Sequence, residues 1–341
     1  MTEDILNLYT KCTQCPRKCQ IDRTQNKKSF CGEGDSLKIA LACLHFGEEP
    51  LITVFGGSGT IFFTGCTLRC AFCQNYQISQ HGMGKDVSAE EFADICLKLE
   101  NLGAENINLV TGSHNIPLIA QGLKIAKEKE LKIPVAWNSS AYESTESLEL
   151  LKGLVDIYLP DLKTLNPLMS EELFKAKDYP AVAKKSIRWM MENAPCKIKK
   201  VKDKKTGQIK EKMFSGVIIR HLLLPGRMED TLLTLDWLKI HADSRAVISL
   251  MSQYTPVKFN EDKKHLEARN KSLSSFQNRF VNEEEDKILR KKIDEYAFEY
   301  MFYQELNTDD EWLPDFERTQ PFSNALAKVV WHWKYGAIDS I

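Results

Sequence analysis

Residues 62–76 read Phe62-Phe63-Thr64-Gly65-Cys66-Thr67-Leu68-Arg69-Cys70-Ala71-Phe72-Cys73-Gln74-Asn75-Tyr76. The stretch follows a short apolar run, and its cysteines are spaced C-x3-C-x2-C in an expected loop. Three thiolates at this spacing can hold a 4Fe–4S cluster and leave one iron without a protein ligand. Zinc is the alternative, because it accepts three cysteines and one further ligand. The stretch therefore predicts a metal centre held by Cys66, Cys70 and Cys73.

From about residue 60, short apolar runs alternate with helix-like stretches. The apolar runs are Thr60–Gly65, Asn106–Thr111, Ile133–Trp137, Val155–Leu159, Gly216–Leu222 and Ala246–Met251. Helices are expected over about 86–102, 116–129, 143–153, 179–193 and 228–241. Six β/α units in sequence imply a parallel sheet wound by right-handed crossovers. We therefore expect an α/β fold with an open partial (β/α)6 barrel, the alternative being a flat, doubly wound sheet. In both, functional groups lie at the carboxyl ends of the strands.

The chain divides into three expected segments. Residues 1–50 form an irregular, Cys-rich N-terminal extension, residues 51–256 the partial barrel, and residues 257–341 a helical and aromatic C-terminal extension packed on the barrel. Within the last segment we expect a helix near 283–303 and an aromatic tail that covers the barrel as a lid or plug. Residues 197–212 carry eight lysines and predict an exposed basic hairpin, either a solvated insertion or a dock for an acidic protein or RNA.

The overall composition indicates a globular protein. Lys and Arg number 46 against 47 Asp and Glu, and 43% of the 341 residues are hydrophobic, which argues against disorder. The balanced charge removes the simplest argument for a nucleic-acid or membrane-surface protein, although nucleic acid is not excluded. No apolar run approaches the ~20 residues that span a bilayer, and the acidic residues 1–5 lack the layout of a secretory signal. We expect a cytoplasmic protein without a membrane partner.

Seven of the ten cysteines fall into two groups. Clustered thiols in a reducing compartment more often bind metal than form disulfides. The upstream group consists of Cys12, Cys15, Cys19 and Cys31. Four thiolates can close either a structural zinc site or a second, fully ligated 4Fe–4S cluster, and both readings stay open. The remaining three cysteines, Cys43, Cys96 and Cys196, are expected to be small buried residues.

The C-x3-C-x2-C loop, with Phe72 before its last cysteine and a strand before the loop, resembles the signature of the radical S-adenosylmethionine (SAM) superfamily. Within it, the chain resembles the group related to pyruvate formate-lyase activating enzymes. The stretches that carry this likeness include Cys12-Thr-Gln-Cys15-Pro-Arg-Lys-Cys19, His45-Phe-Gly-Glu-Glu49-Pro50, Cys73-Gln-Asn-Tyr76, Asp156-Ile-Tyr-Leu-Pro-Asp161-Leu-Lys163, Arg220-His221-Leu-Leu-Leu-Pro225-Gly226 and Met251-Ser-Gln-Tyr254. In that superfamily, the cluster's open iron binds the amino and carboxylate groups of SAM. One electron then cleaves the S–C5′ bond, which yields methionine and a 5′-deoxyadenosyl radical that abstracts hydrogen.

The resemblance places the SAM site at the ends of the later strands. The superfamily's Gly-Gly-Glu-like stretch corresponds to residues 110–115, which lack the glutamate, so Thr111 and Ser113 are the expected substitutes for the amine contact. The other residues that the resemblance assigns to cofactor binding are Phe72, Asn138, Ser139, Asp161, Lys163, Arg220 and His221. Asp161 and Lys163 resemble the ribose-contacting pattern of the activating enzymes, and Arg220 offers a bidentate partner for a carboxylate.

The expected function is that of a radical SAM enzyme with a 4Fe–4S cluster and SAM. A low-potential electron donor such as a flavodoxin or ferredoxin is its expected partner. The resemblance implies a protein substrate, a glycyl-radical enzyme whose backbone glycine loses hydrogen. Two alternatives stand beside it: radical modification of a small molecule, nucleotide or RNA, and a non-catalytic iron–sulfur redox sensor or scaffold.

Overall fold

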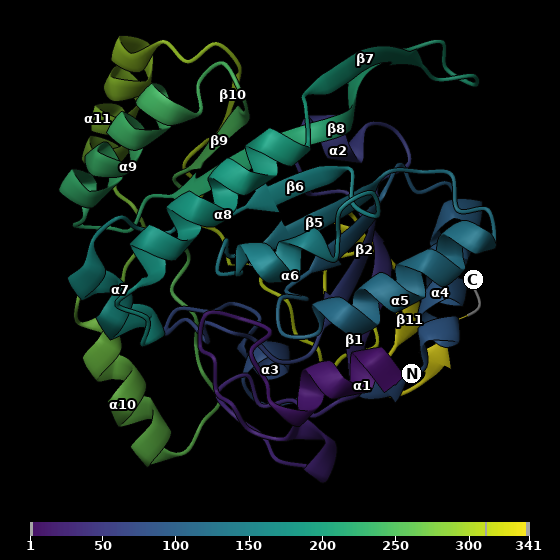
Figure 1. Cartoon of the computed structure of the whole chain (residues 1–341). Coiled ribbons are helices and arrows are strands. Elements are labelled where there is room, and N and C mark those ends of the chain that lie inside the picture. Colours follow the sequence, from purple (N-terminus) through teal and green to yellow (C-terminus); the bar gives the residue numbers. More distant parts are fainter. Residues whose placement is uncertain (1–2, 311, 339–341) are drawn as a thin grey trace.

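One large mixed sheet organises the chain in the computed structural model, which describes residues 3–310 and 312–338 (Figure 1). Its order is β10-β9-β8-β6-β5-β4-β2-β1-β11-β12, with β3 paired to β1 and β7 to β8. The strands are β1 Leu37–His45, β2 Ser58–Phe63, β3 Lys85–Val87, β4 Ile107–Val110, β5 Val135–Ser139, β6 Ile157–Pro160, β7 Lys197–Lys202, β8 Ile209–Leu222, β9 Val247–Met251, β10 Met301–Gln304, β11 Ala327–His332 and β12 Gly336–Ala337.

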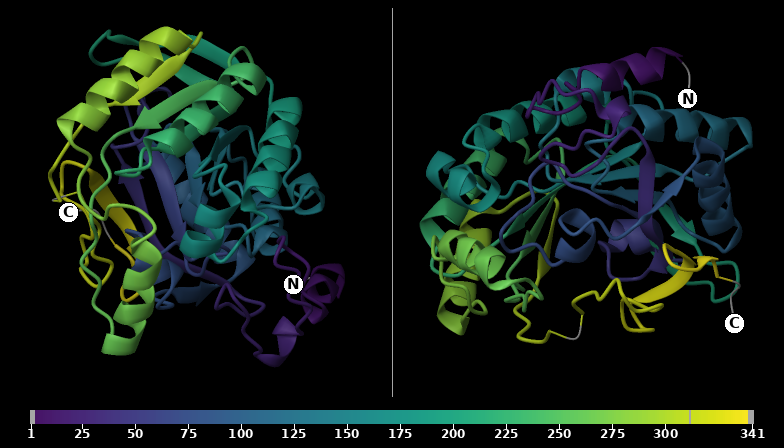
Figure 2. Two further views of the ribbon diagram at one scale, coloured as in Figure 1. Left: turned by 90° about the vertical axis from the view of Figure 1, so that its left-hand side faces the viewer. Right: turned by 90° about the horizontal axis from the view of Figure 1, so that it is seen from below.

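The six strands expected from the apolar runs are all present. They are β2, β4, β5, β6, β8 and β9, and each pairs in parallel with the next. The sheet is curved, and its edge strands β10 and β12 do not pair with each other, so the barrel stays open (Figure 2). The predicted open partial barrel is therefore confirmed.

The helices are α1 Glu3–Thr10, α2 Pro50–Thr53, α3 Tyr76–Ser79, α4 Ala89–Asn101, α5 Ile116–Glu128, α6 Thr145–Glu149, α7 Pro167–Phe174, α8 Tyr179–Asn193, α9 Met228–His241, α10 Lys263–Leu273 and α11 Glu283–Tyr296. Helices α4, α5, α6 and α8 cover the outer face of this sheet, whereas α3 contributes to the inner cavity (Figure 1). A capping box between Ser88 and Glu91 starts α4, as the sequence indicates. The buried Phe92 of that helix packs on Phe63 of β2, with ring centroids 6.0 Å apart, so the helix is fixed to the strand that leads into the cysteine loop.

Residues 1–50 are not irregular throughout, which corrects the expectation for that segment. The nine residues of β1 form a strand between β2 and β11, antiparallel to both. β1 is buried along almost its whole length, and such a continuous apolar run is typical of a strand covered on both faces. The sheet therefore begins before residue 51.

The C-terminal segment also differs from the expectation. The helix predicted to reach residue 303 ends at Tyr296, because Ala297 adopts the left-handed conformation with φ of 43° and caps the helix. Residues 301–304 are instead the strand β10, parallel to β9. Trp331 and His332 belong to β11, which pairs with β1. The C-terminal segment therefore adds strands to both ends of the sheet, whereas the sequence led us to expect only that it packs on the barrel.

The predicted basic hairpin is present, and two of the three isolated cysteines are buried as expected. β7 and the first half of β8 form the expected hairpin, and Lys212 in it pairs with Glu105 at 2.7 Å. Cys43 and Cys96 are buried as expected, whereas Cys196 is exposed at the base of the hairpin. Among the described residues, no helix is long and apolar enough to cross a membrane.

Candidate functional site

A central cavity of about 730 Å³ lies on the inner face of the sheet. Residues from all six parallel strands or the turns after them line it, including Phe63, Val110, Ser139, Asp161, Leu222 and Met251. This is the position expected for functional groups, because the carboxyl ends of parallel strands meet at one edge of the sheet.

The cysteine loop after β2 opens into this cavity. Cys66, Cys70 and Cys73 all line it. The Sγ atom of Cys66 accepts the backbone N–H groups of Leu68 and Arg69 at 3.3 and 3.4 Å. Such hydrogen bonds favour the thiolate over the thiol and tune the potential of a bound cluster. The loop therefore fits a 4Fe–4S cluster with three protein ligands.

A single metal ion needs ligand atoms that converge on one point, whereas the ligands of an iron–sulfur cluster lie farther apart. In the part of the chain that the structure describes, no three His, Cys, Asp or Glu side chains converge closely enough to enclose one ion. The cysteines of a cubane cluster each bind a different iron, so their sulfur atoms need not meet at one point as zinc ligands must.

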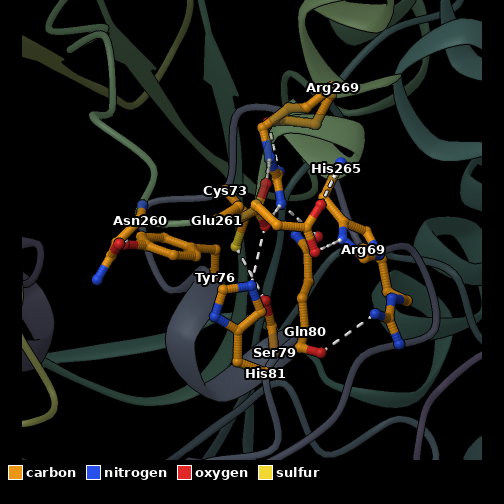
Figure 3. A network of polar contacts seen from close by, with 12 residues as sticks. Arg69, Cys73, Tyr76, Ser79, Gln80, His81, Asn260, Glu261, His265 and Arg269 are labelled. Atoms are coloured by element: carbon orange, nitrogen blue, oxygen red, sulfur yellow. Dashed lines mark hydrogen bonds and ion pairs between the residues drawn. The ribbon is translucent and has the colours of Figure 1, made fainter. Parts of the chain in front are cut away.

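The cysteine loop is held from outside by the C-terminal segment, a contact that the sequence did not reveal (Figure 3). The guanidinium of Arg269, on α10, donates to the backbone oxygen of Ala71 at 2.8 Å and to Oε1 of Gln80 at 3.0 Å. Arg269 also pairs with Glu261, which in turn contacts His81 at 2.9 Å. Both members of the Arg269–Glu261 pair are buried, so this network fixes the far side of the loop.

Phe72 forms part of an aromatic wall of the cavity. Its ring packs edge-on against Phe174, Tyr254 and Phe276, with centroids 6.0–6.1 Å apart. Of these four aromatic residues, Phe72 and Tyr254 line the cavity. Phe72 stands between Cys70 and Cys73 in the sequence. The position is consistent with the cofactor contact that the resemblance implies.

Three charged residues from neighbouring strand ends form a chain of ion pairs across the cavity. Nζ of Lys163 lies 2.8 Å from Oδ2 of Asp161, and Nε of Arg220 donates to Oδ1 of Asp161 at 2.7 Å. Burial alone would raise the pKa of Asp161, but Arg220 and then Lys163 hold that pKa below its usual value. Burial would lower the pKa of Lys163, and Asp161 raises it instead. All three groups are therefore charged at neutral pH.

Seven of the nine predicted cofactor-binding residues line the cavity: Phe72, Thr111, Asn138, Ser139, Asp161, Lys163 and Arg220. The side chain of Asn138 accepts a hydrogen bond from Arg220. Thr111 has a positive φ of 63°, and its N–H donates to the carbonyl oxygen of Asn138 at 3.0 Å. These strand ends are thus tied to one another around the same space.

The other two predicted cofactor-binding residues, Ser113 and His221, are not among the residues that line the cavity. The Ser113 hydroxyl donates to buried Glu143 at 2.5 Å. The His221 ring lies between the backbone oxygen of Leu162 at 2.7 Å and the hydroxyl of Thr231 at 3.1 Å. Successive strand residues point to opposite faces, so Arg220 faces the cavity while His221 faces the outer core.

Two glutamates that the sequence reasoning did not assign also line the cavity. Glu48 and Glu49 lie in the turn between β1 and α2. Oε2 of Glu48 lies 3.6 Å from Nη1 of Arg220, and Oε1 accepts a hydrogen bond from Asn108 at 3.0 Å. Their stretch was part of the resemblance, but its place could not be found without knowing that β1 joins the sheet.

The upstream cysteines lie beside the cysteine loop. Cys12, Cys15 and Cys31 are buried and Cys19 is half-buried. Burial raises the pKa of Cys15 to about 12, and nearby Cys31, Cys12 and Cys19 add to that rise. The buried guanidinium of Arg23 approaches Sγ of Cys12 at 3.9 Å. The four thiols therefore share one neighbourhood, with a cation beside it.

The model of the radical SAM superfamily matches residues 60–238, more than half of the chain, and includes the cysteine loop and the strand ends around the cavity. The chain belongs to the radical SAM superfamily. An uncharacterized protein of Methanocaldococcus jannaschii is 32% identical over 258 residues, which cover 73% of this chain and 68% of that protein.

Two solved structures resemble this radical SAM protein in part. Streptococcus suis SuiB bound to S-adenosylmethionine has a TM-score of 0.44 at 15% identity, over 70% of this chain. The chain spans about half of SuiB, since the match covers 48% of it. Methylornithine synthase (PylB) has a TM-score of 0.41 at 12% identity, over 81% of this chain and 74% of that one.

Membership in the superfamily implies a 4Fe–4S cluster and SAM as cofactors. The three cysteines that fit the cluster, Cys66, Cys70 and Cys73, fall within the matched range. The comparisons support membership in the superfamily, but they do not support membership in the group related to pyruvate formate-lyase activating enzymes.

Proposed function

We propose that this chain is an enzyme that reductively cleaves SAM and uses the resulting 5′-deoxyadenosyl radical to abstract hydrogen from a substrate in the central cavity. The observation that carries the proposal is that the three motif cysteines and the ion-pair chain of Lys163, Asp161 and Arg220 line the same cavity. When bound, the cluster and SAM supply the electron transfer and the radical. The protein supplies position, charge and the exclusion of water.

The residues of the cavity have distinct proposed roles. The carboxylate of Asp161 has lone pairs free to accept ribose hydroxyls, although both its oxygens already contact cations. Lys163 and Arg220 can bind a ligand carboxylate, Arg220 through its planar fork of donors. Asn138 and the Ser139 hydroxyl lie one strand away and can orient the same ligand. Phe72 and its aromatic neighbours keep water from that end of the cavity.

A glycyl-radical enzyme is the first proposed substrate. The likeness of the quoted stretches to the activating enzymes supports it, as does the partial barrel on which they fall. The reaction would remove hydrogen from a backbone glycine that reaches into the cavity. Co-purification of an oxygen-labile partner with a C-terminal glycine loop is the result that this substrate predicts.

A small molecule, or a nucleotide alone or within RNA, is the second proposed substrate, and one observation favours it. Residues from the C-terminal segment line the cavity, among them Gln304, Asn307, Trp312 and Phe322. Polar side chains beside aromatic ones are typical of a small-molecule pocket. Formation of deoxyadenosine that depends on a small compound, without any protein partner, is the result that this substrate predicts.

The four upstream cysteines are proposed to hold a second metal centre. It is either a 4Fe–4S cluster, whose ligands need not meet at one point, or zinc, which would have to draw the sulfur atoms closer together. The shared neighbourhood of these cysteines supports the proposal, and so does Arg23, whose buried charge would offset the negative charge of four metal-bound thiolates. A flavodoxin or ferredoxin is the proposed electron donor. Iron and zinc analysis of the purified protein separates the two metals.

The test of the proposed function is anaerobic. The protein is reconstituted with iron and sulfide, mixed with SAM and a strong reductant, and assayed for 5′-deoxyadenosine beside the Cys70→Ala variant. Deoxyadenosine above that control supports the proposal. A full cluster whose spectrum does not respond to SAM, with no deoxyadenosine, would favour a non-catalytic redox sensor or scaffold. Replacing the chemical reductant by reduced flavodoxin or ferredoxin tests the donor.

A further inference from the structure

Glu48 and Glu49 occupy the end of the central cavity opposite the cysteine loop. β1 runs antiparallel to β2, and His45 at the end of β1 pairs with Ser58 at the start of β2. The turn after β1 therefore lies at the amino end of the parallel strands, whereas the cysteine loop follows the carboxyl end of β2. Both the turn and the loop line the same cavity. We call the Glu48–Glu49 end the acidic floor.

A row of charges joins the acidic floor to the cysteine loop. Glu48 contacts Arg220, Arg220 contacts Asp161, and Asp161 contacts Lys163. Lys163 and Cys70 line the same cavity, so the row ends beside the cysteine loop. With Glu49, three carboxyl groups face two cations in this row. Burial raises the pKa of Glu48 and of Glu49, and the charge of Arg220 opposes that rise. A cation bound at the floor would offset the cost of burial and keep the third carboxyl group ionised.

Glu49 is the carboxyl group of this row with an unpaired buried oxygen. Its side chain is 2% exposed, and its Oε2 atom forms no hydrogen bond. Arg220, and then the backbone N–H of Glu49 and the Ser249 hydroxyl, lower the pKa of this carboxyl group against the larger effect of burial. The Oε2 atom itself still has no donor. A buried carboxylate without a donor is costly, and native proteins satisfy such groups with very few exceptions. The missing donor at this position points to a ligand.

We infer that Glu48 and Glu49 bind the protonated amino group of a small-molecule substrate. The inference rests on the proposed function. An ammonium group has three donors, enough to reach Glu49 and Glu48 together, and its charge balances the row. A ligand held by its amine at the floor extends toward the cysteine loop, where the hydrogen would be abstracted. A backbone glycine within a polypeptide has no ammonium group, so this site favours the small-molecule substrate.

The amino group of SAM has the same chemistry, and the test separates the two sources. The holoenzyme, reconstituted and saturated with SAM under anaerobic conditions, is titrated with n-butylammonium and, in parallel, with neutral butan-1-ol. Binding is followed by calorimetry in the wild type, Glu48→Gln, Glu49→Gln and Glu105→Gln. Glu105 is the matched control, because it is a partly buried carboxylate outside the cavity.

The wild type is expected to bind n-butylammonium at least about tenfold more tightly than butan-1-ol. Glu49→Gln should lose this preference, and Glu105→Gln should keep it. Equal binding of the two probes by the wild type, or a preference that survives both Glu48→Gln and Glu49→Gln, overturns the inference. If Glu49→Gln instead abolishes the response of the cluster spectrum to SAM, the carboxylate serves the amine of SAM, which also overturns it.

The thermal stability of Glu49→Gln distinguishes a ligand-binding role of Glu49 from a structural one. Replacing a buried carboxyl group that has one unpaired oxygen should leave the thermal midpoint of Glu49→Gln equal to or above that of the wild type. A fall of several degrees would assign Glu49 to the structure and overturn the inference. Deoxyadenosine formation by the wild type is measured separately, so failure of the amine site is distinct from failure of the proposed function.

Discussion

The backbone N–H of Cys66 donates to the carbonyl oxygen of Cys31 at 3.3 Å. The first cysteine of the cluster motif is therefore tied to the last cysteine of the upstream group. Arg17, which lies between Cys15 and Cys19, adds a second tie, because its Nε donates to the carbonyl oxygen of Thr67 at 3.0 Å. The two cysteine segments form one structural unit, and a change in one should be felt in the other.

Arg17→Ala should lower the occupancy of the cluster at the motif cysteines. The substitution removes the hydrogen bonds to Thr67 and Phe174 and the contact of the guanidinium with the Phe30 ring, 3.7 Å from its centroid. We expect a loss of about 2 kcal/mol in stability, since hydrogen bonds from a charged donor contribute more than neutral ones. Iron content and the thermal midpoint measure the two effects. Lys11→Ala, an exposed position in the same segment, is the control and should change neither.

Arg269→Met should destabilise the cysteine loop from its other side. Glu261 would lose its buried partner, and the carbonyl oxygen of Ala71 would lose its donor. Breaking a buried ion pair by removing one partner costs about 3–5 kcal/mol. The thermal midpoint of the holoenzyme should fall, and the double variant with Glu261→Gln should recover part of the loss. A double variant no more stable than Arg269→Met would contradict the role given to the pair.

Asp161→Asn should weaken the binding of SAM, whereas Ser113→Ala should leave it nearly unchanged. Asp161→Asn leaves Lys163 and Arg220 without their shared carboxylate, and we expect the apparent affinity for SAM to fall by about tenfold or more. Ser113→Ala removes a hydroxyl bonded to Glu143 away from the cavity, so it should cost about 1 kcal/mol of stability and leave SAM affinity within about twofold. Titration of the cluster spectrum with SAM measures both. Equal losses of affinity would contradict the assignment.

His221 should make the protein less stable in acid. Burial, and then the charge of Lys163, lower the pKa of His221 to about 4, from 6.5 in the unfolded chain. The unfolded state therefore binds the proton first, and stability falls as pH decreases from about 6.5 toward 4. The full effect is about 3 kcal/mol.

The measurement is the free energy of unfolding of wild type and His221→Gln across this range. Glutamine can still donate to Leu162 and accept from Thr231, so the variant should fold. The difference in stability between the two proteins should shrink as pH falls. A constant difference would show that His221 does not titrate in this window.

The features that depend on residues close together along the chain could be predicted from the sequence. The spacing of Cys66, Cys70 and Cys73 and the strand before them identified the cluster loop and led to the superfamily that the comparison confirmed. The six parallel strands and the start of α4 followed from short apolar runs and a capping box, because these signals depend on residues close together along the chain.

The tertiary structure decided what depends on distant residues. β1 lies in the sheet because residues 37–45 pair with residues 58–63 and 327–332, and no local pattern records such a pairing. Because successive side chains of a strand point to opposite faces of the sheet, only one of Arg220 and His221 can face the cavity. The sequence does not say which one, since that depends on how the strand packs in the sheet. Glu48 and Glu49 reach the cavity because β1 is antiparallel to its neighbours. The sequence by itself thus determined the chemistry of the cysteine loop, while the shape and charge of the space around it arise from long-range pairing.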